Sequence, residues 1–181
     1  MKNKILIFML TNCFLSFSQN SKTEYENFKL NENKKLTWQK VYDFEASKDS
    51  ITKIWKDFIL KSSFLNSLKQ NDIGFSGYSN FIKISDLKEL AIAVHSDYNC
   101  FVEIEIKENK YRILISNVKF KPITIDTGMI EVESNFVLED IVVRDNSHEI
   151  RKNSTARKTL FNLNKDFVEL LNLKAKVKND W

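Results

Sequence analysis

Two histidines are the residues of this chain best suited to acid–base or metal chemistry. His95 precedes Ser96 and Asp97, yet neighbours in sequence cannot meet side by side as base, nucleophile and orienting acid. His95 and Asp97 could share a strand face and hold a metal with His148 or Glu103, but no helical histidine pair or tight ligand cluster supports this. Solvated or hydrogen-bonded histidines are therefore favoured, and a hydrolase or isomerase that uses His95 or His148 is the alternative.

Three pairs of carboxylates are the next candidates for chemistry. They are Glu103/Glu105, Glu131/Glu133 and Glu139/Asp140. Two acids on one strand face also describe the solvent side of a hairpin, and a glycosidase needs a cleft between its acids. We therefore expect no catalytic residue, no metal and no cofactor. The 3 glycines of the chain also exclude a multi-glycine phosphate loop.

Charge is separated along the chain. Five acids and no Lys or Arg lie between Asp126 and Asp140, whereas nine basic residues against four acids lie between Arg144 and Lys178. The basic region suits an anionic surface or partner, and the alternative is solubility with pairing to the acidic segment. The anionic-partner candidates are Arg151, Lys152, Arg157 and Lys158.

The first eighteen residues have the layout of a secretory signal peptide. Lys2 and Lys4 precede an apolar run over residues 5–17, and Ser16 and Ser18 stand at the −3 and −1 positions of a cut before Gln19. The run is too short for a spanning helix, which needs about 20 residues. We expect a periplasmic or extracellular protein without a transmembrane segment after cleavage. Cleavage lowers the net charge from +4 to +2 by removing two lysines.

Two cysteines bear on this localisation. Cys13 follows Leu10-Thr11-Asn12, loosely a lipoprotein box, but a small residue is normal where Asn12 stands. A lipid anchor at Cys13 is therefore the lesser alternative. In the exported chain Cys100 is the single thiol, so no internal disulfide forms, and its apolar strand predicts a buried, inert group.

Periodicity predicts the elements that must position these residues. Residues 19–35 are polar without a sustained period and predict a flexible lead-in, and residues 36–45 predict a strand with a bulge near Lys40 and Val41. Apolar spacings of three and four predict helices over 48–68 and 154–174. Alternation from Val102, a Glu108-Asn109-Lys110 turn and a second β-rich run predict a hairpin. Short strands are expected at 75–84, at 89–95 and around Gly128 within 123–143, with a helix near Asp86–Leu90 as the alternative for the second.

The expected domain organisation is a signal peptide over 1–18, the lead-in over 19–35 and a single α+β domain over 36–178. Strands clustered between two helices predict a curved antiparallel sheet packed on one face by both helices, in strand-helix-strands-helix order.

The segments KLTWQKVYDFEASKDSI, DIGFSGYSNF and FVEIEIKENKYRILISNVKF make the chain resemble a family of exported proteins of Bacteroidetes-type bacteria. That family has a TBP-like fold and unknown function, so the resemblance implies the fold and no catalytic residue. Fold does not fix function, and DNA binding does not follow from it. Nucleic acid is also unsuited to an exported protein whose aromatics stand at core spacings.

A non-enzymatic binding or interaction module of the cell envelope is the function that these observations favour. A curved sheet under helices leaves room for a groove between its layers, suited to an apolar ligand or a peptide edge of an envelope protein. The residues expected to line that groove are Tyr78, Phe81, Tyr98 and Tyr111.

Overall fold

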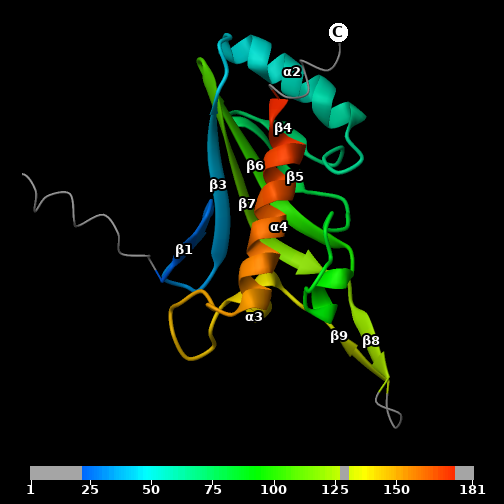
Figure 1. The fold of residues 1–181 in the computed structure, drawn as a ribbon. Helices are drawn as coiled ribbons and strands as arrows, with labels where there is room; N and C mark the ends of the chain where they lie inside the picture. Colours follow the sequence, from blue (N-terminus) through cyan, green and yellow to red (C-terminus); the bar gives the residue numbers. More distant parts are fainter. Residues whose placement is uncertain (1–21, 127–130, 174–181) are drawn as a thin grey trace, which may run out of the picture.

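The computed structural model describes residues 22–126 and 131–173 (Figure 1). One seven-stranded sheet, in the order β1-β2-β3-β7-β6-β5-β4, forms the body of the molecule, and every neighbouring pair is antiparallel. Helix α4 lies across one face of this curved sheet, α2 at one end of α4 and α3 at the other (Figure 1). The α+β class, the antiparallel sheet and the packing of helices on it are thus confirmed.

The bounds of the elements are as follows. The large sheet consists of β1 (Glu24–Tyr25), β2 (Phe28–Leu30), β3 (Leu36–Asp43), β4 (Lys69–Asn71), β5 (Gly74–Tyr78), β6 (Tyr98–Lys107) and β7 (Lys110–Phe120). A two-stranded arm consists of β8 (Ile123–Asp126) and β9 (Glu131–Ser134). The helices are α2 (Lys48–Lys61), the 3-10 helix η2 (Ile92–His95), α3 (Leu138–Val142) and α4 (Ser154–Leu171).

The central hairpin β6–β7 follows the predicted alternation. Val102, Ile104 and Ile106 face the helices, while Glu103 and Glu105 lie on the opposite, open face of the sheet. The pairing register of β6 with β7 shifts once, between Asn99 and Phe101. The bulge expected near Lys40 and Val41 is wrong, because β3 pairs with β7 without a break from Thr37 to Asp43.

The N-terminal lead-in is also corrected. From Glu24 onward the chain forms two strands of the sheet, and Phe28 and Leu30 are buried beside Trp38 and Leu36, their partners on β3. Two inward side chains are too few to give a periodic signal, yet their burial holds this stretch in place. The predicted signal peptide over 1–18 lies outside the described residues.

Helix α2 is shorter than predicted, because the Ser62 hydroxyl accepts a hydrogen bond from Leu65 N at 3.2 Å and the chain turns after Lys61. The strand predicted over 89–95 is replaced by a helical turn, whereas the short strands expected around Gly128 are present as β8 and β9. Residues 92–95 form η2, and Leu138–Val142 forms α3, whose Asp140 carboxylate accepts a hydrogen bond from Val137 N at 3.1 Å. Residues 174 onward of the second predicted helix lie outside the described residues.

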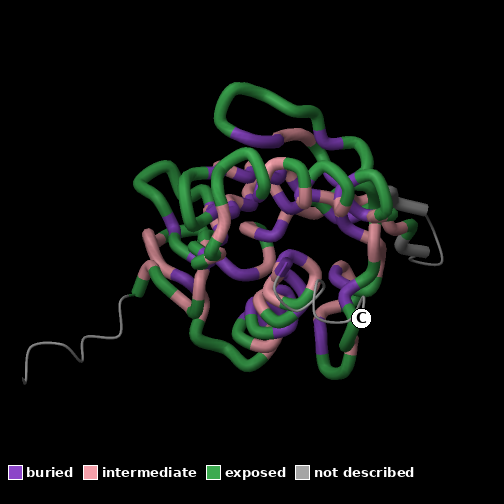
Figure 2. Tube along the Cα trace, turned by 90° about the horizontal axis from the view of Figure 1, so that it is seen from above, coloured by how far each residue is buried: buried purple, intermediate pink, exposed green. Residues whose placement is uncertain are grey.

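The core fills the space between the sheet and the helices (Figure 2). Its largest members, Trp38, Trp55 and Phe167, come from β3, α2 and α4 and are fully buried. Gly74 permits close strand pairing here: its φ is +153°, and a Cβ would lie 2.0 Å from the Ile104 carbonyl oxygen. The sheet and the helices are thus held together by the buried side chains between them.

Candidate functional site

The residues expected to line a groove do not lie together. Tyr98 and Tyr111 are fully buried in the core. The Tyr98 ring contacts Phe167 of α4 at 6.1 Å between centroids. Tyr111 donates a hydrogen bond to Leu171 O at 3.3 Å and accepts one from Leu173 N at 3.1 Å. These two tyrosines attach α4 to the sheet, and the burial of Tyr98 contradicts its expected place in the groove lining. Tyr111 also borders a depression of about 220 Å³ together with Val41 and Arg112.

Tyr78 and Phe81 are the exposed members of that set, and they lie apart from the other two. Tyr78 is on the open face, where its ring meets Phe101 edge-on at 5.4 Å and its hydroxyl accepts a hydrogen bond from Asn117 Nδ2 at 2.7 Å. Phe81 lies beneath Lys121, whose Nζ is 5.0 Å from the ring centroid. The sequence does not distinguish the two buried rings from the two exposed ones, because an aromatic residue in a β-rich segment can point to either face of the sheet.

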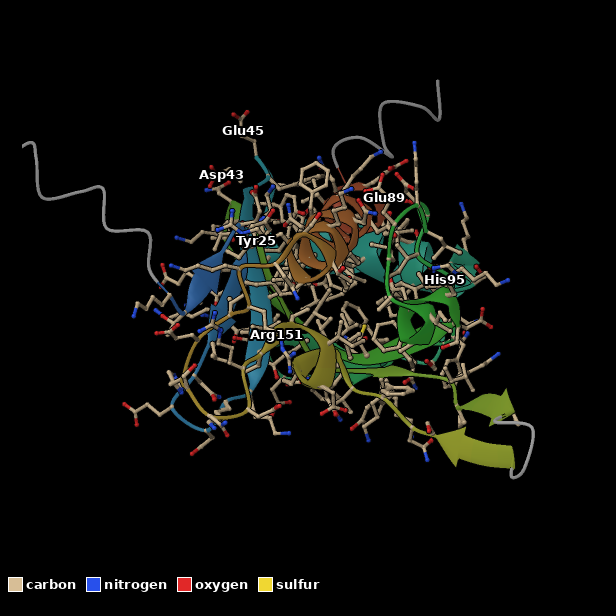
Figure 3. The ribbon with its side chains drawn as sticks, turned by 60° about the horizontal axis from the view of Figure 1, so that its bottom comes forward. Tyr25, Asp43, Glu45, Glu89, His95 and Arg151 are labelled. Carbon is tan, nitrogen blue, oxygen red and sulfur yellow. The ribbon has the colours of Figure 1, made fainter. Side chains whose placement is uncertain are left out.

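The histidines occupy separate places. His95 ends η2 on the exposed surface, and His148 lies in the loop between α3 and α4. In Figure 3 His95 is on one side of α4, and Tyr25 and Arg151 are on the other. Within residues 22–126 and 131–173 neither imidazole makes a hydrogen bond or an ion pair, and no group of three or more metal-ligating side chains occurs.

The acids are engaged in structural contacts. Glu105 pairs with Arg112 on the open face, and the hydrogen bond from Arg112 lowers the pKa of this carboxyl. Glu139 accepts a hydrogen bond from Leu36 N at 3.0 Å, which holds α3 to the start of β3. The side chains of Glu131 and Glu133 lie outside the described residues. Glu103 lies beside Glu105 on the open face, and its side-chain hydrogen bond also lowers the pKa of the Glu105 carboxyl.

The four basic candidates divide by their partners. Lys158 pairs with Glu89, and Arg151 donates to Val143 O at 2.7 Å and lies 3.5 Å from an Asp145 oxygen. Lys152 and Arg157 are exposed, and their side chains make no hydrogen bond or ion pair with any residue that the structure describes. Without forming an ion pair, Lys152 still acts on the Glu149 carboxyl, whose pKa it helps to lower.

Arg151, Lys152 and Arg157 surround one depression of about 190 Å³, together with a residue outside the predicted set, Lys22. We call this depression the basic hollow; its full lining is Lys22, Glu24, Tyr25, Ile150, Arg151, Lys152 and Arg157. Lys22 was not foreseeable, because it belongs to the stretch expected as a flexible lead-in. The structure thus brings three of four candidates together and separates Lys158.

Local hydrogen bonds build the basic hollow. Ile150 N donates to Lys22 O at 2.8 Å, which fixes the segment before β1 against the loop before α4. The Asn153 side chain accepts a hydrogen bond from Ala156 N at 2.9 Å and caps α4, so Arg157 is presented on the first turn of the helix.

Positive charge dominates the rim. Glu24, the single acid of the lining, forms an ion pair with Lys29, with 3.2 Å between Glu24 Oε1 and Lys29 Nζ. Lys22 is 2.7 Å from Glu149 behind the rim, and its hydrogen bond lowers the pKa of the Glu149 carboxyl. Burial raises the pKa of the Tyr25 hydroxyl above its ordinary value, and this neutral hydroxyl is a hydrogen-bond donor in the lining. Lys22 and Arg151 are engaged with Glu149 and Asp145, so Lys152 and Arg157 supply the charge that suits a phosphate, sulfate or carboxylate.

The sequence matches no known family model, and no curated protein has a significantly similar sequence. The fold is similar to the crystal structure of a TBP-like protein from Parabacteroides distasonis, with a TM-score of 0.50 and 14% sequence identity. The match covers 83% of this chain and 95% of that chain. This likeness confirms the TBP-like fold, and at this identity it shows the fold alone.

Proposed function

We propose that this protein is an exported, non-enzymatic interaction module that binds an anionic group of its partner in the basic hollow. The observation that carries the proposal is the pair Lys152 and Arg157, exposed on one rim and unpaired within the described part of the chain. The other cations of the rim, Lys22 and Arg151, are held in place by Glu149 and by Val143 O. Lys22 and Arg151 are thus fixed before an anion binds, whereas Lys152 and Arg157 become ordered on binding.

The volume limits the ligand. Pockets for drug-sized molecules measure about 300–1,000 Å³, and the basic hollow of about 190 Å³ is smaller. A single phosphate, sulfate or carboxylate group carried by a larger partner fits this space. Binding of such a group by charge-assisted hydrogen bonds requires no catalytic residue. The imidazoles of His95, at the end of η2, and His148, in the loop before α4, have no hydrogen-bond or ion-pair partner among the residues that the structure describes, which supports the same choice over a hydrolase or isomerase.

Export rests on the sequence. Lys2, Lys4, the apolar run and the small residues before Gln19 support a signal peptide, and membership in the exported family of unknown function is part of this proposal. Expression of the full chain in a Gram-negative host tests it. We expect the protein in the periplasmic fraction with Gln19 as its first residue; an intact Met1 end in the cytoplasm would contradict export.

Anion binding is tested by titrating the purified protein with inorganic pyrophosphate and measuring heat. We expect the double variant Lys152→Ala/Arg157→Ala to bind at least about tenfold more weakly, because it removes two charge-assisted contacts. The control Lys53→Ala/Lys56→Ala removes the same charge from exposed positions of α2. Equal losses in the two variants would contradict a site at the basic hollow, and so would absence of binding by the native protein.

A further inference from the structure

A row of exposed side chains runs along the outer side of α4 and begins at Arg157, which also lines the basic hollow. Arg157, Phe161 and Lys165 are four residues apart, so they lie above one another on one face of the helix, and all three are exposed. Phe161 is 51% exposed. Figure 1 shows that the side of α4 that faces away from the sheet is uncovered by the other described elements. We call these three residues the α4 ridge.

The surroundings of Phe161 distinguish it from an ordinary exposed apolar residue. Cations stand one turn before it and one turn after it, at Arg157, Lys158 and Lys165. Lys158 is engaged with Glu89, whereas Arg157 and Lys165 have no ion pair within the part of the chain that the structure describes. The acid nearest along the ridge, Glu169, follows Lys165 by a full turn.

An aromatic side chain flanked by free cations is the arrangement with which peripheral proteins contact an anionic bilayer. The ring enters the boundary between headgroups and acyl chains, and Lys and Arg remain at the level of the lipid phosphates. Each basic residue near an anionic surface contributes about 1 kcal/mol, and apolar burial adds to this attraction. No described helix is long and apolar enough to span a membrane.

We propose that the α4 ridge and the basic hollow together dock this protein on an anionic lipid surface. Phe161 enters the interface, Lys165 contacts lipid phosphates, and the basic hollow receives one headgroup phosphate between Lys152 and Arg157. The shared residue Arg157 makes the two features one continuous surface. This inference rests on the proposed function and specifies the partner as a membrane rather than a protein.

Flotation with vesicles tests the inference. Vesicles of phosphatidylcholine with about 30% phosphatidylglycerol present the anionic surface, and pure phosphatidylcholine is the reference. We expect the native protein to float with the anionic vesicles alone and to be released by high salt, which screens the attraction. Equal flotation with both kinds of vesicle would overturn the inference.

Two variants locate the contact. Phe161→Ser is expected to weaken vesicle binding at least about threefold, because it removes the apolar part of the contact. Its control is Leu60→Ser on α2, since Leu60 is 70% exposed and lies outside the ridge. Lys165→Ala is expected to weaken vesicle binding about fivefold, the effect of one basic residue at an anionic surface. Equal binding by Phe161→Ser and Leu60→Ser would overturn the inference.

Pyrophosphate titration separates the two proposals. Phe161→Ser leaves the basic hollow intact, so its affinity for pyrophosphate should equal that of the native protein. Native protein that binds pyrophosphate but no anionic vesicles would overturn membrane docking and leave anion binding by a soluble or protein partner. Native protein that binds neither would overturn both proposals.

Discussion

Helix α4 has two sides that differ in what they contact. Phe167 on the inner side is fully buried, with its ring centroid 5.5 Å from that of Trp38 and 6.3 Å from that of Phe28. Phe161 on the outer side is half exposed. The same residue type therefore stabilises the fold at one position and is free for a partner at another. The position of each phenylalanine on the helix determines whether its ring is buried, and burial determines whether the ring stabilises the core or is accessible to a partner.

The largest expected effect follows from the inner aromatic. Phe167→Ala should lower the free energy of unfolding by about 3–5 kcal/mol, because it leaves a cavity against β2, β3 and β6. Phe161→Ala, its control on the same helix, should change this free energy by less than about 0.5 kcal/mol. Urea denaturation followed by tryptophan fluorescence measures both. Similar values for the two variants would contradict the division of α4 into a stabilising and a contact side.

The inner side also has a polar part that sequence spacing does not reveal. The Asp166 carboxylate is buried and accepts hydrogen bonds from Ser85 N at 2.9 Å and from the Ser85 hydroxyl. Asn162 donates to Asp86 O at 2.7 Å. These contacts fasten the segment that follows β5 onto α4.

Asp166→Ala should therefore cost about 1–3 kcal/mol, because Ser85 N and its hydroxyl lose a charged acceptor in a partly buried place. Lys165→Ala, one residue away on the outer side, is the matched control and should leave stability unchanged. Hydrogen exchange of the Ser85 amide provides a local measurement. Unchanged protection of that amide in Asp166→Ala would show that the hydrogen bond contributes little.

The long periodic elements of this fold were predictable from sequence. The β6–β7 hairpin and α4 each bury a continuous stripe, and a stripe is visible in the order of residues. Strands β1 and β2 were not predictable, because two buried side chains form no period. The distinction between Arg151 and Lys152 was likewise hidden, because the hydrogen bond of Arg151 to Val143 O depends on tertiary structure.

A third test concerns the end of α4, where Tyr111 joins the helix to the sheet. Burial raises the pKa of this hydroxyl from 10.0 to about 12. The associated stability is fully present below pH 10 and is lost as pH rises through about 12, because the unfolded tyrosine ionises first. Tyr111→Phe should lower the free energy of unfolding by about 1 kcal/mol at neutral pH. It should also flatten the decline of stability between these pH values.

Cys100 provides the internal control for this alkaline region. Burial raises the pKa of its thiol to about 12, and Cys100→Ala removes that group without affecting Tyr111. Measurement of stability against pH for both variants separates the contributions of Tyr111 and Cys100, while Tyr42 and Tyr98, whose pKa values burial also raises, are present in both variants. An unchanged pH profile in Tyr111→Phe would mean that ionisation of Tyr111 does not contribute to alkaline unfolding.

The smallest effect is expected at Lys158, which borders the two sides of α4. Its ion pair with Glu89 is partly exposed, and such pairs contribute about 0–1 kcal/mol, so Lys158→Ala should change stability within this range. Its charge is neutralised by Glu89, so we also expect pyrophosphate affinity to stay within about twofold of the native value. Glu89→Ala frees Lys158 and tests this reasoning in reverse. If Glu89→Ala strengthened vesicle binding and Lys158→Ala left it unchanged, pairing within the chain would be what separates a structural cation from one available to a partner.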